Sequence, residues 1–251
     1  MARALPRGFL APHWPLPACV RAAVTTRQIA GASPPPFDGF NLGTRCGDDA
    51  LAVAYNRGAL VRLLALPRAP LWLQQVHGAG VVDADRDDLA DEPHGDAAVT
   101  RRAHVVLAVL TADCLPVLLA AADGSAVGVA HAGWRGLAAG VLEAAVAALR
   151  QPRERVLAWL GPAIGAQSYE VGEEVRAAFV ERDPAAVAAF TATRSGHWHC
   201  NLYALARQRL AAAGVTQVHG GGHDTFADAR LYSYRRDHTT GRFATLIWRE
   251  A

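Results

Sequence analysis

Two histidines and one cysteine stand at positions that favour a metal site. His77 follows Gln75-Val76, Cys114 follows Ala112-Asp113, and His131 begins the segment His131-Ala-Gly-Trp-Arg-Gly136. Two imidazoles and a thiolate suit a soft or borderline divalent ion such as zinc, and three protein ligands leave a fourth position open for water or substrate. We therefore predict that His77, Cys114 and His131 are both the metal ligands and the catalytic residues.

The predicted hairpin around Asp123-Gly124 brings two of these ligands together. This dipeptide lies between two apolar runs and is typical of a two-residue hairpin turn. Counting back from the turn places Pro116 opposite His131, with Cys114 as a diagonal neighbour of that histidine. Diagonal neighbours are roughly 7–8 Å apart at Cα, so the thiol and the imidazole are expected to share one ion.

Hydrophobic patterning predicts a mixed α/β fold in one domain, 1–251, with mixed β-sheets flanked by helices. Strands are expected over Leu71–Val76, Gly80–Ala84, Val105–Thr111, Leu115–Ala121, Ala126–Ala130 and Val156–Leu160, with a last one ending near Trp248. Helices are expected from Asp48-Asp49 to about Leu66, from Leu137 to Arg150, up to about Val180, and from about Leu202 to Ala213. The acidic run from Asp83 to Asp96 is interpreted as a surface excursion.

The composition indicates a protein of the cytoplasm that does not bind nucleic acid. The 251 residues are 51% hydrophobic, and 25 basic residues, all arginine, face 23 acidic ones for a formal charge of +2. The arginines are scattered and form no basic stripe. Four widely spaced cysteines indicate reduced thiols, and the prolines between residues 12 and 17 interrupt any signal peptide.

The window from Val105 to Ala122 is almost wholly apolar and about long enough to cross a bilayer. Asp113 and Pro116 lie at its centre, which favours two buried strands with a break between them. No membrane partner is therefore expected.

Several segments are candidates for binding an anion. Gly133 and Gly136 flank the start of a predicted helix, where free backbone N–H groups attract anions. Arg235 and Arg236 can each hold phosphate through a guanidinium fork, but on a strand they point to opposite faces, so only one enters the site. The pair at His197 and His199 lacks a third ligand nearby, and we interpret it as a solvated strand or loop.

The order of several short blocks resembles that of the YfiH-like family, whose members were first described as polyphenol oxidases or laccase-domain proteins and later as zinc-dependent purine nucleoside phosphorylases. The resemblance spans the chain from Asn41-Leu-Gly43 to the C-terminus. It is carried by Gln75-Val-His77, Ala112-Asp-Cys114, His131-Ala-Gly-Trp-Arg-Gly136, Gly161-Pro-Ala-Ile164, Tyr169-Glu-Val-Gly172, Ser233-Tyr-Arg-Arg-Asp237 and Thr240-Gly-Arg242.

The resemblance implies zinc held by the His–Cys–His trio and phosphorolysis of adenosine, inosine, guanosine and methylthioadenosine, with deamination of adenosine as a further activity. We expect Asn41, Arg135 and Arg235 to contact substrate or phosphate, in a monomer or homodimer. One departure is visible, because Asp224-Thr225 stands where the family usually carries Cys-Thr.

Three other functions remain open on the sequence. A copper-dependent, laccase-like polyphenol oxidase would use the same His–Cys–His ligands, but blue-copper centres usually add an axial Met and the only Met is Met1. A metal-free hydrolase with Cys114 as nucleophile and His131 as base would act on an amide, for example in cell-wall precursors. The third is a binding protein in which zinc only fixes the loops.

Overall fold

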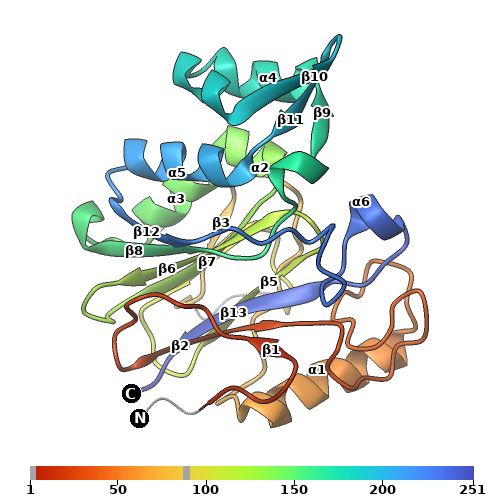
Figure 1. Ribbon diagram of the computed structural model, residues 1–251. Coiled ribbons are helices and arrows are strands. Elements are labelled where there is room, and N and C mark those ends of the chain that lie inside the picture. Colours follow the sequence, from red (N-terminus) through yellow and green to blue (C-terminus); the bar gives the residue numbers. More distant parts are fainter. Residues whose placement is uncertain (1–3, 87–90) are drawn as a thin grey trace.

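Two β-sheets pack face to face between helices, so the protein has four layers (Figure 1). The computed structural model describes residues 4–86 and 91–251. In spatial order the larger sheet consists of β12 (Gln217–Gly220), β8 (Val156–Leu160), β6 (Leu115–Ala121), β7 (Val127–Ala132), β4 (Ala97–Thr100) and β3 (Val81–Asp83). The second consists of β1 (Phe9–Leu10), β2 (Val20–Thr25), β13 (Phe243–Arg249) and β5 (Val106–Thr111).

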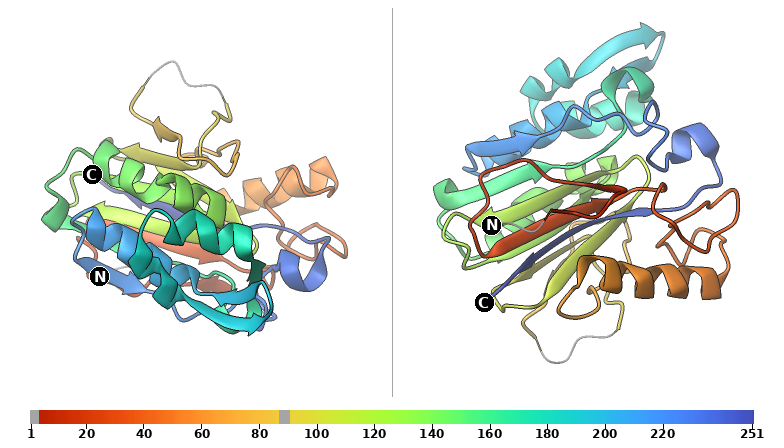
Figure 2. Two further views of the ribbon diagram at one scale, coloured as in Figure 1. Left: turned by 90° about the horizontal axis from the view of Figure 1, so that it is seen from above. Right: turned by 60° about the horizontal axis from the view of Figure 1, so that its bottom comes forward.

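Helices cover the outer face of each sheet (Figure 2). The six-stranded sheet is covered by α2 (Trp134–Ala139), α3 (Val141–Ala148) and α5 (Leu202–Ala212), and the four-stranded sheet by α1 (Ala50–Leu64). A third sheet of β10 (Phe190–Arg194), β11 (His197–Cys200) and β9 (Glu170–Gly172) lies with α4 (Glu173–Val180) beyond α2. Near the cavity the chain forms α6 (Tyr234–Asp237), and 3-10 turns span Arg153–Arg155, Ala166–Ser168 and Pro184–Ala189.

Strand β6 shows why the sequence between residues 105 and 122 is so apolar. All of its residues are buried. Val117 and Leu119 point into the cluster under the helices, whereas Leu118 and Ala120 point into the cluster between the sheets. A strand buried on both faces loses the usual alternation of polar and apolar residues. Within the described ranges no helix has the length and apolar character needed to cross a membrane.

The mixed α/β class predicted from the sequence is confirmed, and most predicted elements lie where they were expected. Two differ. Leu71–Val76 forms no regular strand, because this segment makes only isolated bridges at Leu71 and Gln74. The helix predicted from Leu137 to Arg150 begins earlier, at Trp134, and is broken into α2 and α3 by Gly140, which has a φ of 97° and so interrupts the helical backbone.

The acidic run from Asp83 to Asp96 is only partly on the surface. Residues 87–90 lie outside the described part of the chain. At its C-terminal end Asp96 is fully buried and directly precedes β4, a strand that the sequence analysis did not predict. Strand β4 pairs with β7 in antiparallel register, and Ala97 faces Ala130. Asp96, which precedes Ala97, therefore lies beside His131, which follows Ala130.

Candidate metal centre

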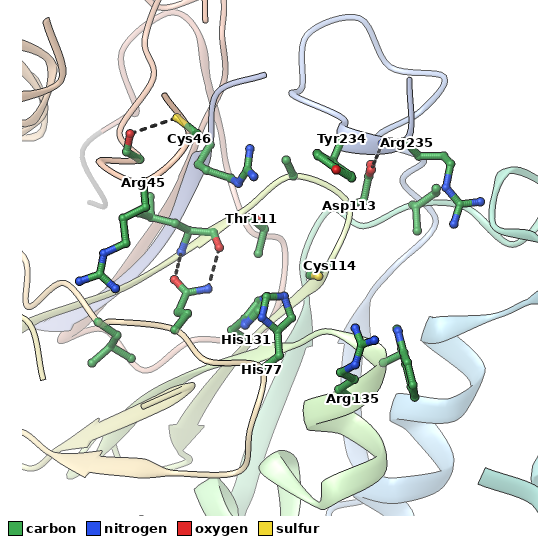
Figure 3. Close-up of a pocket in the computed structure, with 18 of the residues that line it drawn as sticks. Arg45, Cys46, His77, Thr111, Asp113, Cys114, His131, Arg135, Tyr234 and Arg235 are labelled. Atoms are coloured by element: carbon green, nitrogen blue, oxygen red, sulfur yellow. Dashed lines mark hydrogen bonds between the residues drawn. The ribbon is translucent and has the colours of Figure 1, made fainter. Parts of the chain in front are cut away.

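The predicted ligands His77, Cys114 and His131 come together at one point of the structure (Figure 3). Their ligand atoms all lie within 4.8 Å of one another, and the imidazole rings meet edge to face with centroids 4.8 Å apart. A tetrahedral zinc with bonds of about 2.0–2.3 Å brings its ligand atoms to about 3.5 Å from one another. Small side-chain rotations would therefore bring the three ligand atoms to the spacing that a bound zinc ion requires. The donor set of two nitrogens and one sulfur suits zinc.

The hairpin of β6 and β7 has the predicted register. Pro116 faces His131, and Cys114 lies just before the first residue of β6. The three ligands differ in accessibility, because His131 is buried, Cys114 is half-buried and His77 is exposed. The exposed imidazole leaves one side of the centre open to the cavity described below, as a reacting metal site requires.

Asp96, which the sequence analysis missed, connects the two histidines. Its carboxylate accepts hydrogen bonds from the backbone N–H groups of His77 at 2.9 Å and Gly78 at 2.7 Å. It also lies 2.9 Å from Nδ1 of His131. With Nδ1–H donated to the carboxylate, Nε2 of His131 is free to bind a metal, which is the usual outer-shell arrangement for a zinc-binding histidine.

Two glycines leave room for the ligands. A Cβ atom on Gly133 would lie 2.9 Å from Sγ of Cys114 and 3.3 Å from the ring of His77. One on Gly136 would lie 2.8 Å from the carbonyl oxygen of Gly78. The backbone of the His131-to-Gly136 segment thus approaches the metal ligands themselves, in addition to beginning helix α2.

Cys114 and His131 shift each other's ionisation in the metal-free site. Burial raises the pKa of the Cys114 thiol, but the charge and hydrogen bonds of His131 and His77 outweigh it and lower this pKa to about 6. Burial lowers the pKa of His131, but the Cys114 thiolate and Asp96 outweigh it and raise this pKa to about 9. The cysteine is therefore held as a thiolate, the form that binds metals.

The ligand trio lines a cavity of about 550 Å³, a size common for small-molecule sites. Five arginines line the same cavity: Arg45, Arg57, Arg135, Arg235 and Arg242. Figure 3 shows Arg135 and Arg235 on one side of the histidines and Arg45 on the other. Arg57 forms an ion pair with Glu92 at 2.8 Å, whereas no carboxylate pairs with Arg135, Arg235 or Arg242 within the described ranges. The cavity is suited to anions.

Arg235 lies in the cavity and Arg236 does not, as predicted, but the predicted strand is wrong. Both residues lie on the short helix α6, which begins where Ser233 accepts a hydrogen bond from the N–H of Arg236. The Arg235 guanidinium stacks over the ring of Tyr169, and its backbone N–H donates to Asp113 at 2.6 Å. Arg236 instead pairs with Asp237 and donates to backbone carbonyls away from the cavity.

Arg135 lines the cavity, whereas Asn41 lies behind its wall. Arg135 is exposed, lines the cavity and stacks on Trp134. Asn41 is fully buried behind the wall, where its side-chain oxygen accepts from the N–H groups of Gly43 and Arg242. Asn41 therefore holds two cavity-lining segments together, and its hydrogen bonds are made within the protein.

The sequence analysis singled out two further features that lie outside the trio. Asp224, the departure from the family pattern, accepts hydrogen bonds from the N–H of Gly165 and the hydroxyl of Ser168, and so fixes the loop before Tyr169. His197 and His199 lie on β11 and are half-buried. Among the described residues they join no cluster of metal-binding side chains.

Fold and site together define a mixed α/β protein with a His–Cys–His centre open to a cationic cavity. A family model described as multi-copper polyphenol oxidoreductase laccase matches residues 21–250. The chain is 54% identical to a purine nucleoside phosphorylase of Xylella fastidiosa over 97% of both chains. It is 47% identical to purine nucleoside phosphorylase YfiH of Escherichia coli, over 96% of this chain and 98% of that one.

Solved structures show the same fold. YlmD from Geobacillus stearothermophilus superposes with a TM-score of 0.91 at 32% identity, covering 99% of this chain and 98% of that one. Hypothetical protein YfiH from Bacillus licheniformis gives a TM-score of 0.87 at 28% identity, covering 92% and 93%. The chain therefore belongs to the laccase-like, YfiH-like family, and the resemblance noted in the sequence is confirmed.

We predict that Asp96→Asn weakens metal binding about 10- to 100-fold, because an amide cannot accept all the hydrogen bonds that orient His77 and His131. Competition with a chromophoric zinc chelator measures the affinity. Asp83→Asn is the matched control, since Asp83 pairs with Arg101 away from the site. An unchanged zinc affinity in the Asp96 variant would show that this carboxylate does not orient the ligands.

We also predict that alkylation of Cys114 in the metal-free protein follows a thiolate with a pKa of about 6. The labelling rate should be near its plateau at pH 7 and fall as the pH drops through 6. Iodoacetamide labelling followed by peptide mass spectrometry measures it at each cysteine. Buried Cys200, whose pKa is raised to about 12 by burial, should remain unlabelled. A Cys114 rate still rising steeply through pH 8.5 would contradict the prediction.

Proposed function

We propose that the protein is a zinc-dependent purine nucleoside phosphorylase with one zinc ion bound by His77, Cys114 and His131. The observation that carries the proposal is the position of this trio beside a cavity with arginines that lack carboxylate partners in the described ranges. The names of the relatives support the same activity. The substrates would be a purine nucleoside and inorganic phosphate.

The arginines beside the trio are suited to binding phosphate. Arg135 and Arg235 each stack on an aromatic ring, with 4.5 Å from the Arg135 guanidinium to the Trp134 centroid and 5.1 Å from that of Arg235 to the Tyr169 centroid. Stacking restrains the guanidinium planes and leaves N–H edges for a bidentate contact with phosphate. Asp113 strengthens the arrangement by fixing the backbone of Arg235.

In the proposed reaction the C1′–N9 bond breaks and its electron pair leaves with the purine, which takes up a proton. A phosphate oxygen forms the new bond to C1′, and ribose 1-phosphate and the free base result. The guanidinium groups hold phosphate beside the reacting carbon and lower the entropic barrier to attack. Bound zinc would add positive charge that orients phosphate or stabilises negative charge developing in the reaction.

A metal-free cysteine hydrolase is the second candidate, supported by the chain of contacts from Asp96 through His131 to Cys114. This arrangement has the order of a catalytic triad. The exposed His77 beside the thiol has no role in such a triad but completes a metal site. For copper, the described residues contain one cluster of three metal-binding groups, whereas multicopper oxidation requires several centres.

We predict one zinc ion per chain and phosphate-dependent release of base from inosine or adenosine. Elemental analysis and detection of ribose 1-phosphate test these claims, with ammonia release from adenosine followed to detect deamination. Cys114→Ser should remove most of the metal and the activity with little change in the circular dichroism spectrum. A wild-type protein without stoichiometric metal, or without ribose 1-phosphate, would overturn the proposal, and amide hydrolysis lost in Cys114→Ser would favour the hydrolase.

We predict that Arg235→Ala raises the KM for phosphate about ten- to a hundredfold, since a charge-assisted contact contributes about 1.5–3 kcal/mol. Arg236→Ala should lower the melting temperature instead, because Arg236 holds α6 to neighbouring carbonyls. Steady-state kinetics with varied phosphate, together with thermal melts, compares them. Equal effects of the two substitutions on the phosphate KM would remove Arg235 from the phosphate site.

A further inference from the structure

The segment that leads to His77 lies against the outer edge of strand β5. In the described part of the chain β5 is the last strand of the four-stranded sheet, with β13 as its neighbour. Residues 71–76 lie on its other side, where Leu71 forms an isolated bridge to Leu107. The outer edge of such a strand presents N–H and C=O groups that have no partner within the sheet. The contacts made there determine how the His77 segment docks.

Gln75 binds this edge with its side chain. Its Nε2 donates to the carbonyl oxygen of Leu110 at 2.8 Å, and its Oε1 accepts from the N–H of Leu110, also at 2.8 Å (Figure 3). A carboxamide has a donor and an acceptor, as a peptide group does, so it satisfies both outward groups of Leu110 at once. The two bonds fix the half-buried Gln75 at one position along β5.

The three metal ligands need a connection between each pair of them. The register of β6 and β7 brings Cys114 to His131, and the carboxylate of Asp96 connects His131 with the backbone of His77. The remaining pair is His77 and Cys114, which lie on separate segments of the chain.

Gln75 and Leu110 supply this third connection. Gln75 precedes His77 by two residues, and Leu110 precedes Cys114 by four. The backbone of His77 has a φ of 61°, in the left-handed region that non-glycine residues rarely adopt. Such a conformation persists where the surrounding contacts hold it. The carboxamide bonds hold this backbone from one side, and the bonds from Asp96 hold it at His77 itself.

We propose that Gln75 is a positioning residue of the metal centre, which holds His77 at the distance from Cys114 that a bound ion requires. The inference rests on the proposed zinc site. Gln75 acts through two residues of backbone and preorganises the ligands before the ion binds. Replacing an outer-shell group that orients metal ligands typically weakens metal binding about 10- to 100-fold.

The test measures zinc affinity by competition with a chromophoric chelator. Gln75→Met keeps the length of the side chain, removes both hydrogen bonds and should weaken zinc binding about tenfold or more. With Co²⁺ as a spectroscopic probe, this variant should keep the thiolate-to-cobalt charge-transfer band of Cys114. The d–d bands of a tetrahedral site should lose intensity, as they should in His77→Ala.

Gln74→Met is the matched control. The side chain of Gln74 accepts a hydrogen bond from Arg45 at 2.7 Å, so its loss should leave the zinc affinity and the cobalt spectrum unchanged. Gln75→Glu still accepts from the N–H of Leu110 but places a second oxygen against its carbonyl group, and it should also weaken zinc binding. Thermal melts of the metal-free variants separate the two roles, because a purely structural residue changes the melting temperature and leaves the zinc affinity of the folded protein unchanged.

Unchanged zinc affinity in Gln75→Met would overturn the inference, as would an equal loss in Gln74→Met. If the Gln75 variants do not fold, hydrogen exchange of the metal-free wild type decides. The amide of Leu110 should be protected by Gln75, and exchange at the rate of an open strand edge would overturn the role. A wild type that binds no zinc would overturn the proposed zinc site and this role with it. Zinc binding that is unaffected at Gln75 would overturn the role alone.

Discussion

The geometry of the candidate metal centre depends on one buried carboxylate. Asp96 has no exposed surface, and its oxygens bind the backbone around His77 and the ring of His131. An ionised carboxylate is costly to bury unless it is hydrogen-bonded, and here backbone N–H groups and an imidazole supply those bonds. Burial raises the pKa of Asp96, but the hydrogen bonds from His131, Gly78 and His77 outweigh it, and the net shift is downward.

Part of this arrangement was predictable because it is local in the sequence. Asp123-Gly124 specifies a two-residue turn, and the turn fixes Pro116 opposite His131 by counting alone. The role of Asp96 depends instead on pairing between β4 and β7, which come from separate parts of the chain. Nothing in the sequence of the acidic segment distinguishes the fully buried Asp96 from half-buried Asp85 or exposed Asp91, so sequence analysis placed Asp96 on the surface.

The segment around Arg235 shows a different limit of sequence analysis. A short run such as Tyr234-Arg-Arg-Asp237 is compatible with a strand or with one helical turn, since both periods place Arg235 and Arg236 on different sides. The side chain of Ser233 favours the helix, because it accepts a hydrogen bond from the N–H of Arg236 and so caps the helix N-terminus. The conclusion that one arginine enters the cavity was correct, although the predicted strand was not.

The hairpin of β6 and β7 has a consequence for how the protein assembles. Cys114 directly precedes β6 and His131 lies on β7, so these two ligands meet as soon as the hairpin forms. His77 lies at the end of a segment that forms no regular strand. Contacts close in sequence form at lower entropic cost than distant ones. An ion that binds only the complete trio stabilises the docking of the His77 segment above all. A metal ion bound by the trio would therefore join the His77 segment to a hairpin that has already formed.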